Sequence, residues 1–216
     1  MFYPAKKTQE AILFYSKKIQ TDETGKAQFL PNVPQFACNE KIYFFPEGNF
    51  SFADENIKSL SANAPYRVRS NKMKNGCVVY VFDFDENENV MTNSHYLLRD
   101  IVNLGVRAGN APLASASYLE KSSEALYKAT KAITGTSSNF IVAGKITFAE
   151  KTKKTDDGNF SCTLQGDIFC IDLENGETVF RTKQMATKTG TTAYKAEDAC
   201  RNALTKLLAE KIIYGL

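Results

Sequence analysis

The chain has 216 residues, of which 43% are hydrophobic and 24% are charged, and this balance excludes global disorder. No apolar run approaches the roughly 18–20 residues that a membrane-spanning helix needs. The net charge of +3 is too small to indicate a nucleic-acid or membrane partner by itself.

Residues 1–72 differ from the rest of the chain, because eight of the fifteen Phe residues lie within the first 52 residues, among prolines and turn signals. Residues 11–19 (AILFYSKKI) fit a strand or a short helix, residues 41–52 (KIYFFPEGNFSF) fit two short strands around a turn, and residues 59–65 (SLSANAP) fit a loop. We therefore expect an irregular aromatic-rich extension or a small β subdomain.

The first residues carry only a short apolar patch, Ala11–Tyr15, which is shorter than the roughly 7–15-residue core of a signal peptide. Two locations stay open at this point. The protein is expected in the cytoplasm if Met1 is its native start. It is expected in the periplasm or at the outer membrane if a leader has been removed.

Residues 73–216 are predicted to form an α/β binding domain. It opens with a buried strand over 77–84 (CVVYVFDF), an apolar run between Gly76 and an acidic stretch. A helix follows Ser94, whose hydroxyl suits an N-cap. One face of this helix is expected to carry Leu97, Leu98, Ile101, Val102 and Gly105. A second helix is predicted over 115–134, before Gly135.

Three strands and a final helix complete the domain. Alternating residues predict strands over 139–150, 160–173 and 177–185, joined by a lysine-rich hairpin loop over 151–159 and a tight Asn175-Gly176 turn. The final helix has an apolar stripe of Ala193, Ala196, Cys200, Ala203, Leu207 and Leu208. The predicted fold is α/β (α+β), with the element order β-α-α-β-β-β-α and helices packed on a mixed sheet.

Catalytic and metal-binding signals are weak. His95 is the only histidine, so a Ser-His-Asp or Cys-His site would need this residue to reach a nucleophile. The segment Asp83–Asn89 begins like a calcium loop, but Glu88 stands where the loop requires glycine and Ser94 stands where it requires glutamate. We predict no catalytic residue, no metal and no cofactor.

Charged groups near the hairpins are expected to be solvated. These are the lysines Lys151, Lys153 and Lys154 and the carboxylates Asp156, Asp157, Asp172 and Glu174. The five cysteines contain no CxxC pair and are odd in number, which argues against a disulfide framework or a zinc site. We expect Cys38, Cys77, Cys162, Cys170 and Cys200 to be buried free thiols.

A more specific pattern joins two segments, Phe140–Ile146 (FIVAGKI) and Ile171–Phe180 (IDLENGETVF), with Asp172 and Gly176 at fixed places. It resembles the α/β domain shared by lipoprotein activators of penicillin-binding proteins, the curli secretion lipoprotein, flagellar assembly proteins of the bacterial envelope and the N-terminal domain of TolB. The resemblance implies a non-enzymatic binding or assembly module of the cell envelope, acting through a protein partner or self-association. It assigns no site residue.

The C-terminal segment also supports an alternative. Residues 188–208 (KTGTTAYKAEDACRNALTKLL) look like the end of a double-stranded RNA-binding domain, in which a glycine-containing loop and cations at a helix start contact phosphates. The contacts would be Lys188, Lys195 and Arg201. The acidic neighbours Glu197 and Asp198 would repel a phosphate backbone, so nucleic acid is the less favoured partner.

Overall fold

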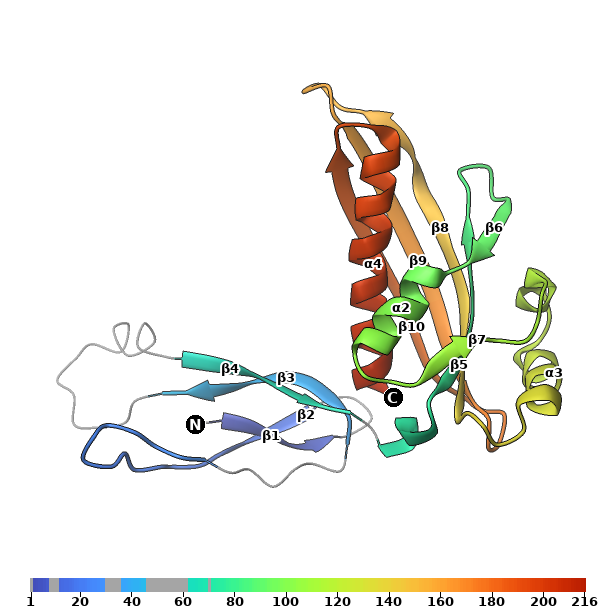
Figure 1. Cartoon of the computed structure of the whole chain (residues 1–216). Helices are drawn as coiled ribbons and strands as arrows, with labels where there is room; N and C mark the ends of the chain where they lie inside the picture. The colour runs from blue at the N-terminus through green and yellow to red at the C-terminus, as the bar shows by residue number, and fades with distance from the viewer. Residues whose placement is uncertain (1, 8–11, 30–35, 46–61, 70) are drawn as a thin grey trace. The chain divides into compact units, whose positions relative to one another are not determined.

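The computed structural model describes residues 2–7, 12–29, 36–45, 62–69 and 71–216 (Figure 1). The chain divides into two compact units, unit 1 (Met1–Asn71) and unit 2 (Lys72–Leu216). Among the described residues, no helix is both long enough and apolar enough to cross a lipid bilayer.

Unit 1 contains a four-stranded antiparallel sheet in the order β2-β1-β3-β4. Its strands are β1 (Phe2–Lys7), β2 (Ile12–Ser16), β3 (Cys38–Phe44) and β4 (Ala62–Val68). Of the two structures predicted for residues 11–19, a strand or a short helix, the strand is observed over β2. The loop predicted over 59–65 is wrong from Ala62 onward, and Pro65 is tolerated there because β4 is an edge strand. The turn and second strand predicted after Phe45 lie outside the described residues.

Unit 2 is a mixed α/β domain, which confirms the predicted fold class. After the short 3-10 helix η1 (Asn71–Asn75), its elements are β5 (Cys77–Phe84), β6 (Val90–Asn93), α2 (His95–Asn103), β7 (Ala108–Asn110), the 3-10 helix η2 (Ala116–Glu120), α3 (Ser123–Thr134), β8 (Phe140–Lys154), β9 (Phe160–Asp172), β10 (Thr178–Gly190) and α4 (Ala193–Gly215).

The sheet of unit 2 has the order β10-β9-β8-β5-β6, and β7 also pairs with β5. The β5–β8 and β5–β7 pairs are parallel, and the other pairs are antiparallel. The short strands β6 and β7 are absent from the sequence-based prediction. They share the free side of β5, where β7 pairs with its beginning and β6 with its end.

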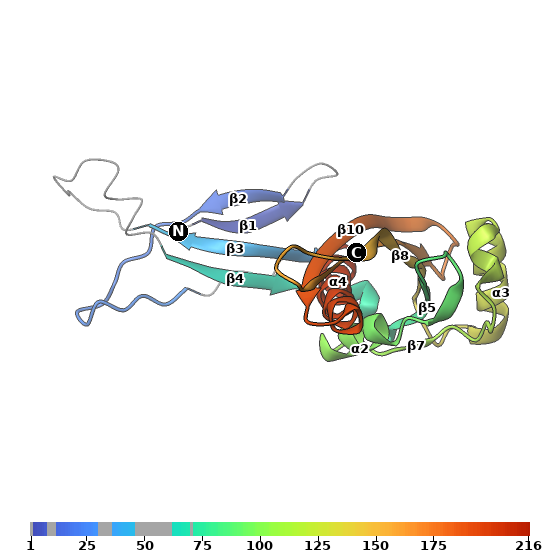
Figure 2. The ribbon, with the colours of Figure 1, turned by 90° about the horizontal axis from the view of Figure 1, so that it is seen from above.

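Two buried clusters fill the two faces of this sheet. Because successive strand side chains point to opposite faces, β5 contributes Val79 and Val81 to one cluster and Tyr80 and Phe82 to the other. The first cluster is covered by α2 and α4, and the second by η2 and α3. Figure 2 shows α2 and α4 together on one side, with α3 apart from them beside β5.

The helices of the middle segment differ in part from the prediction. Helix α2 begins directly after Ser94, as predicted, but the Ser94 side chain makes no capping hydrogen bond. The single helix predicted over 115–134 is wrong in its first third, where η2 precedes a break. The break occurs at Ser122, whose Oγ accepts a hydrogen bond from the Ala125 backbone N–H at 3.2 Å and so starts α3.

The hairpin strands are longer than predicted. Strand β8 continues through the lysine-rich stretch to Lys154, and β10 continues to Gly190. Backbone pairing needs no apolar side chain, so a polar stretch can stay in the ladder. At the end of β10, a Cβ atom added to Gly190 would lie 2.5 Å from the Ala196 backbone nitrogen, so glycine permits the close turn into α4.

Helix α4 packs on the sheet with one side and on α2 with another. Ala196, Cys200 and Leu208 of the predicted stripe are buried. Because α2 covers a second side of the helix, Arg201 and Thr205 are buried as well. Arg201, which lies outside the predicted apolar stripe, is therefore part of the buried surface of this helix.

Candidate functional site

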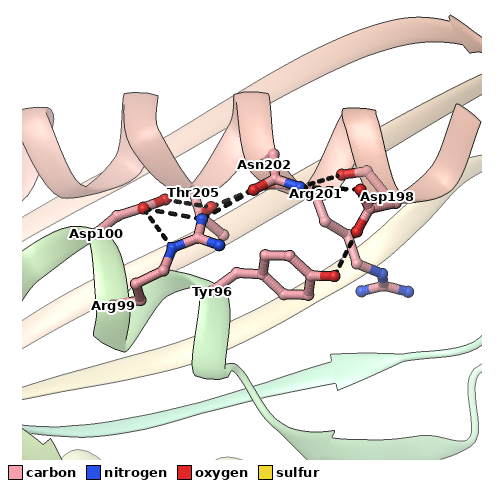
Figure 3. A network of polar contacts seen from close by, with 7 residues as sticks. All are labelled: Tyr96, Arg99, Asp100, Asp198, Arg201, Asn202 and Thr205. Carbon is pink, nitrogen blue, oxygen red and sulfur yellow. Dashed lines mark hydrogen bonds and ion pairs between the residues drawn. The ribbon is translucent and has the colours of Figure 1, made fainter. Parts of the chain in front are cut away.

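Polar side chains form a network along the seam between α2 and α4 (Figure 3). The Tyr96 hydroxyl donates to Asp198 Oδ1 at 2.5 Å, and this contact raises the pKa of Tyr96 to about 12. The Thr205 hydroxyl donates to Asp100 Oδ2 at 2.7 Å. These groups satisfy one another across the seam, which is the arrangement expected of a structural network.

A buried ion pair lies beside this seam, at the end of β5. Arg201 Nη1 is 3.4 Å from Asp83 Oδ2, and both side chains are less than 10% exposed. The Arg201 guanidinium also lies over the Phe148 ring, 5.6 Å from its centroid. Burial raises the pKa of Asp83, and the positive charge of Arg201 opposes that rise. Arg201 therefore compensates a buried carboxylate.

The three cations proposed to contact RNA do not meet at one exposed surface. Lys188 and Lys195 are exposed, on β10 and in the first turn of α4. Arg201 is buried and paired with Asp83, so it is not available to a phosphate. Nothing in the described part of the chain favours the RNA-binding alternative.

His95 lies at the start of α2, beside a groove of about 1020 Å³. The groove is lined mainly by Phe82 and Phe84 of β5, by β6 and by residues 114–117. The His95 ring is 4.2 Å from the Tyr96 ring centroid to centroid, and the residue is exposed. Within the described residues, His95 forms no hydrogen bond to a carboxylate or a hydroxyl.

The carboxylates near turns have two different environments. Asp85 Oδ1 accepts hydrogen bonds from the backbone N–H groups of Asn87 and Asn89, both at 2.8 Å, so this side chain closes the β5–β6 turn. Asp172 was expected to be solvated, but it is buried and accepts a hydrogen bond from the Glu174 N–H at 2.8 Å. The described residues contain no group of three side chains suited to hold a metal ion.

All five cysteines are buried and free, as predicted. A hydrogen bond with Cys162 lowers the pKa of the Cys200 thiol to about 7 and raises that of Cys162. Burial raises the pKa of Cys77 to about 12. Since Cys162 and Cys200 are fully buried, their packing in the first cluster is their evident role.

The sheet face opposite α4 holds the second cluster at one end, and the part that η2 and α3 leave uncovered carries exposed side chains. We call this part the open face. It consists of side chains from three strands: Lys145, Thr147, Gln165, Asp167, Phe169, Val179, Arg181, Lys183 and Met185. The strand register sets Lys145, Asp167 and Lys183 in one row. The next row ends in Arg181, whose guanidinium lies over the Phe169 ring at 5.1 Å from its centroid.

The β10 part of the open face mixes apolar and cationic groups. Val179 is 40% exposed and Met185 is 54% exposed, and the exposed cations Arg181 and Lys183 stand between them. Sequence reasoning named no partner-binding residue. The available signal was the period-2 pattern of residues 179–185, in which one side of the strand carries two basic residues between two apolar ones.

Solved structures show only distant similarity. PelC from Paraburkholderia phytofirmans, solved as a dodecamer, is 16% identical over 63% of this chain and 86% of that chain, with a TM-score of 0.40. Lipoprotein GNA1162 from Neisseria meningitidis is 14% identical over 59% and 96% of the two chains, with a TM-score of 0.38. These scores are too low to support an argument about function or assembly. No curated protein matches the chain.

The family comparison is more informative. Residues 76–213, well over half of the chain, match the family described as "TP0693-like lipoprotein, C-terminal domain". This supports the lipoprotein kinship expected from the sequence, although the matching family is none of the four that the strand motifs resemble. The chain belongs to the TP0693-like lipoproteins, and residues 76–213 are their C-terminal domain.

Proposed function

We propose that this protein is a non-enzymatic binding module of the bacterial cell envelope, acting through protein–protein contacts or self-association. The observation that supports this most directly is the open face. It exposes Val179 and Met185 beside Arg181 and Lys183 on a strand whose other face packs against α4. Exposed apolar groups next to charges on a rigid support are typical of interaction surfaces.

Two further observations support the proposal. Lipoprotein family membership supports a place in the cell envelope. The buried polar groups that could have served chemistry, Asp83, Arg201 and Asp100, are used to join α4 to β5 and α2. His95, the sequence candidate for a base, is exposed in a groove lined by both apolar and polar side chains, and among the described residues it forms no hydrogen bond to a carboxylate or a hydroxyl.

Site-specific photo-crosslinking tests this function. A photoreactive phenylalanine analogue replaces Met185 on the open face or, as a control, Ile133 on α3, which is 59% exposed against 54% for Met185. In cells that make the full chain, we expect a discrete adduct from position 185 and none from position 133. Adducts at neither position, or equal adducts at both, would contradict the proposal. Repeating the reaction on purified protein at several concentrations identifies self-association.

A further inference from the structure

Strand β10 has an edge with no partner strand. It pairs with β9 from Thr178 to Gly190, and no other strand of the described residues pairs with it. Helix α4 packs on one face of β10, where Phe180 and Ala186 lie against the first cluster. Backbone N–H and C=O groups along an edge are a template for another strand.

The charge of this edge strand has one sign. Thr178–Gly190 contains Arg181, Lys183 and Lys188 and no acidic residue. Lys183 is in register with Asp167 of β9, but neither Lys183 nor Arg181 forms an ion pair with a carboxylate among the described residues. Two exposed cations therefore stand beside an unpaired backbone, and Asp167 is the one carboxylate of β9 in register with them.

The positive charge of β10 indicates which kind of strand can pair with its free edge. If the β10 strands of two copies paired in the antiparallel register centred on Thr182, Arg181 of each copy would face Lys183 of the other, and like charges across a strand pair are destabilising. An acidic strand would instead place carboxylates next to these two cations. The edge thus favours a partner of opposite charge over a second copy of this chain.

We infer, on the basis of the proposed binding function, that the β10 edge accepts an extended acidic segment of a partner protein as an additional strand. The backbone hydrogen bonds of this acidic segment to β10 would supply the affinity, and its alternate side chains would supply the specificity. Val179, Arg181, Lys183 and Met185 follow one another at intervals of two residues on one side of β10. A complementary segment therefore has the order apolar, acidic, acidic, apolar at the same intervals.

A synthetic peptide tests this inference on the full chain. The fluorescein-labelled probe has the sequence Leu-Thr-Glu-Thr-Glu-Thr-Leu, which reads the same in both directions and so fits parallel or antiparallel pairing. Two control peptides accompany it: one has lysine in place of both glutamates, and the other has N-methyl groups on every backbone amide, so that neither of its edges can donate a hydrogen bond. The second keeps the charge but cannot complete the backbone ladder. Binding is measured by fluorescence anisotropy.

We expect the acidic probe to bind, the two control peptides not to bind, and amides of β10 to gain protection from hydrogen exchange. Lys183→Glu should weaken binding about tenfold or more. Lys154→Glu makes the same change of charge at an exposed residue of the β8–β9 hairpin and should leave binding unchanged. Circular dichroism melts confirm that both variants are folded.

Three results would overturn the inference: no binding of the acidic probe at millimolar concentration, equal binding of its N-methylated form, or equal weakening by Lys183→Glu and Lys154→Glu. The failure of this inference differs from a failure of the proposed function. A crosslink from position 185 without probe binding would refute the acidic strand and leave the binding function standing.

Discussion

Arg201 and Asp83 form a buried ion pair between α4 and the end of β5. Removing one partner of such a pair leaves the other charge buried and uncompensated. We expect Arg201→Met to lower the free energy of unfolding by about 3–5 kcal/mol, measured by urea denaturation. Lys128→Met is the control, because both side chains of its ion pair with Glu124 are 70% exposed, so the change should have little effect on the free energy of unfolding. Equal losses in the two variants would contradict the structural role of Arg201.

The same pair predicts a pH dependence. Burial raises the pKa of Asp83 in the native state. At a pH above this raised pKa the buried carboxylate is ionised, which lowers the free energy of unfolding. As the pH falls through the raised pKa the carboxylate is protonated, and this loss of stability disappears. Without the Arg201 cation the pKa rises further. The stability difference between wild type and Arg201→Met should therefore be largest at neutral pH and should narrow as the pH falls. Urea titrations between pH 7 and pH 4.5 check this, and a constant difference would contradict it. His95, the other titratable group acting on Asp83, is the same in both proteins.

Among the elements, the junction from β10 into α4 depends on one glycine. A Cβ atom at Gly190 would lie 2.5 Å from the Ala196 nitrogen, whereas a Cβ atom at Gly109 of β7 would meet no atom within 4 Å. We expect Gly190→Ala to destabilise the protein by about 1–3 kcal/mol through overcrowding. Gly109→Ala should be neutral or stabilising by a few tenths of a kcal/mol, up to about 1. Thermal unfolding of the two variants measures the contrast, and equal melting temperatures would show that the junction can relax.

The same elements show what the sequence could and could not predict. Strand β5 is a continuous apolar run and β9 alternates with period two, so both strands were predictable. The strands β6 and β7 are four and three residues long, too short for a period to show. The burial of Arg201 depends on α2 lying against α4, a tertiary contact with no local signal. In the sequence, the open face appears only as the alternation in residues 179–185. This pattern does not reveal that no strand of the described residues pairs with the outer edge of β10.

At the scale of the whole molecule, both buried clusters of unit 2 are made from residues 73–213, so this unit closes its own core. A closed core on this scale is the usual condition for independent folding. We expect the fragment 72–216 to unfold in one cooperative thermal transition and to keep a near-ultraviolet circular dichroism signal. The fragment 72–190 is the control: it lacks α4 and with it Cys200, Leu204, Leu208 and Ile212 of the first cluster. It should bind a hydrophobic dye and melt without a sharp transition. If both fragments melted cooperatively, α4 would not be the element that seals the sheet, and the support for the open face on its other side would be lost.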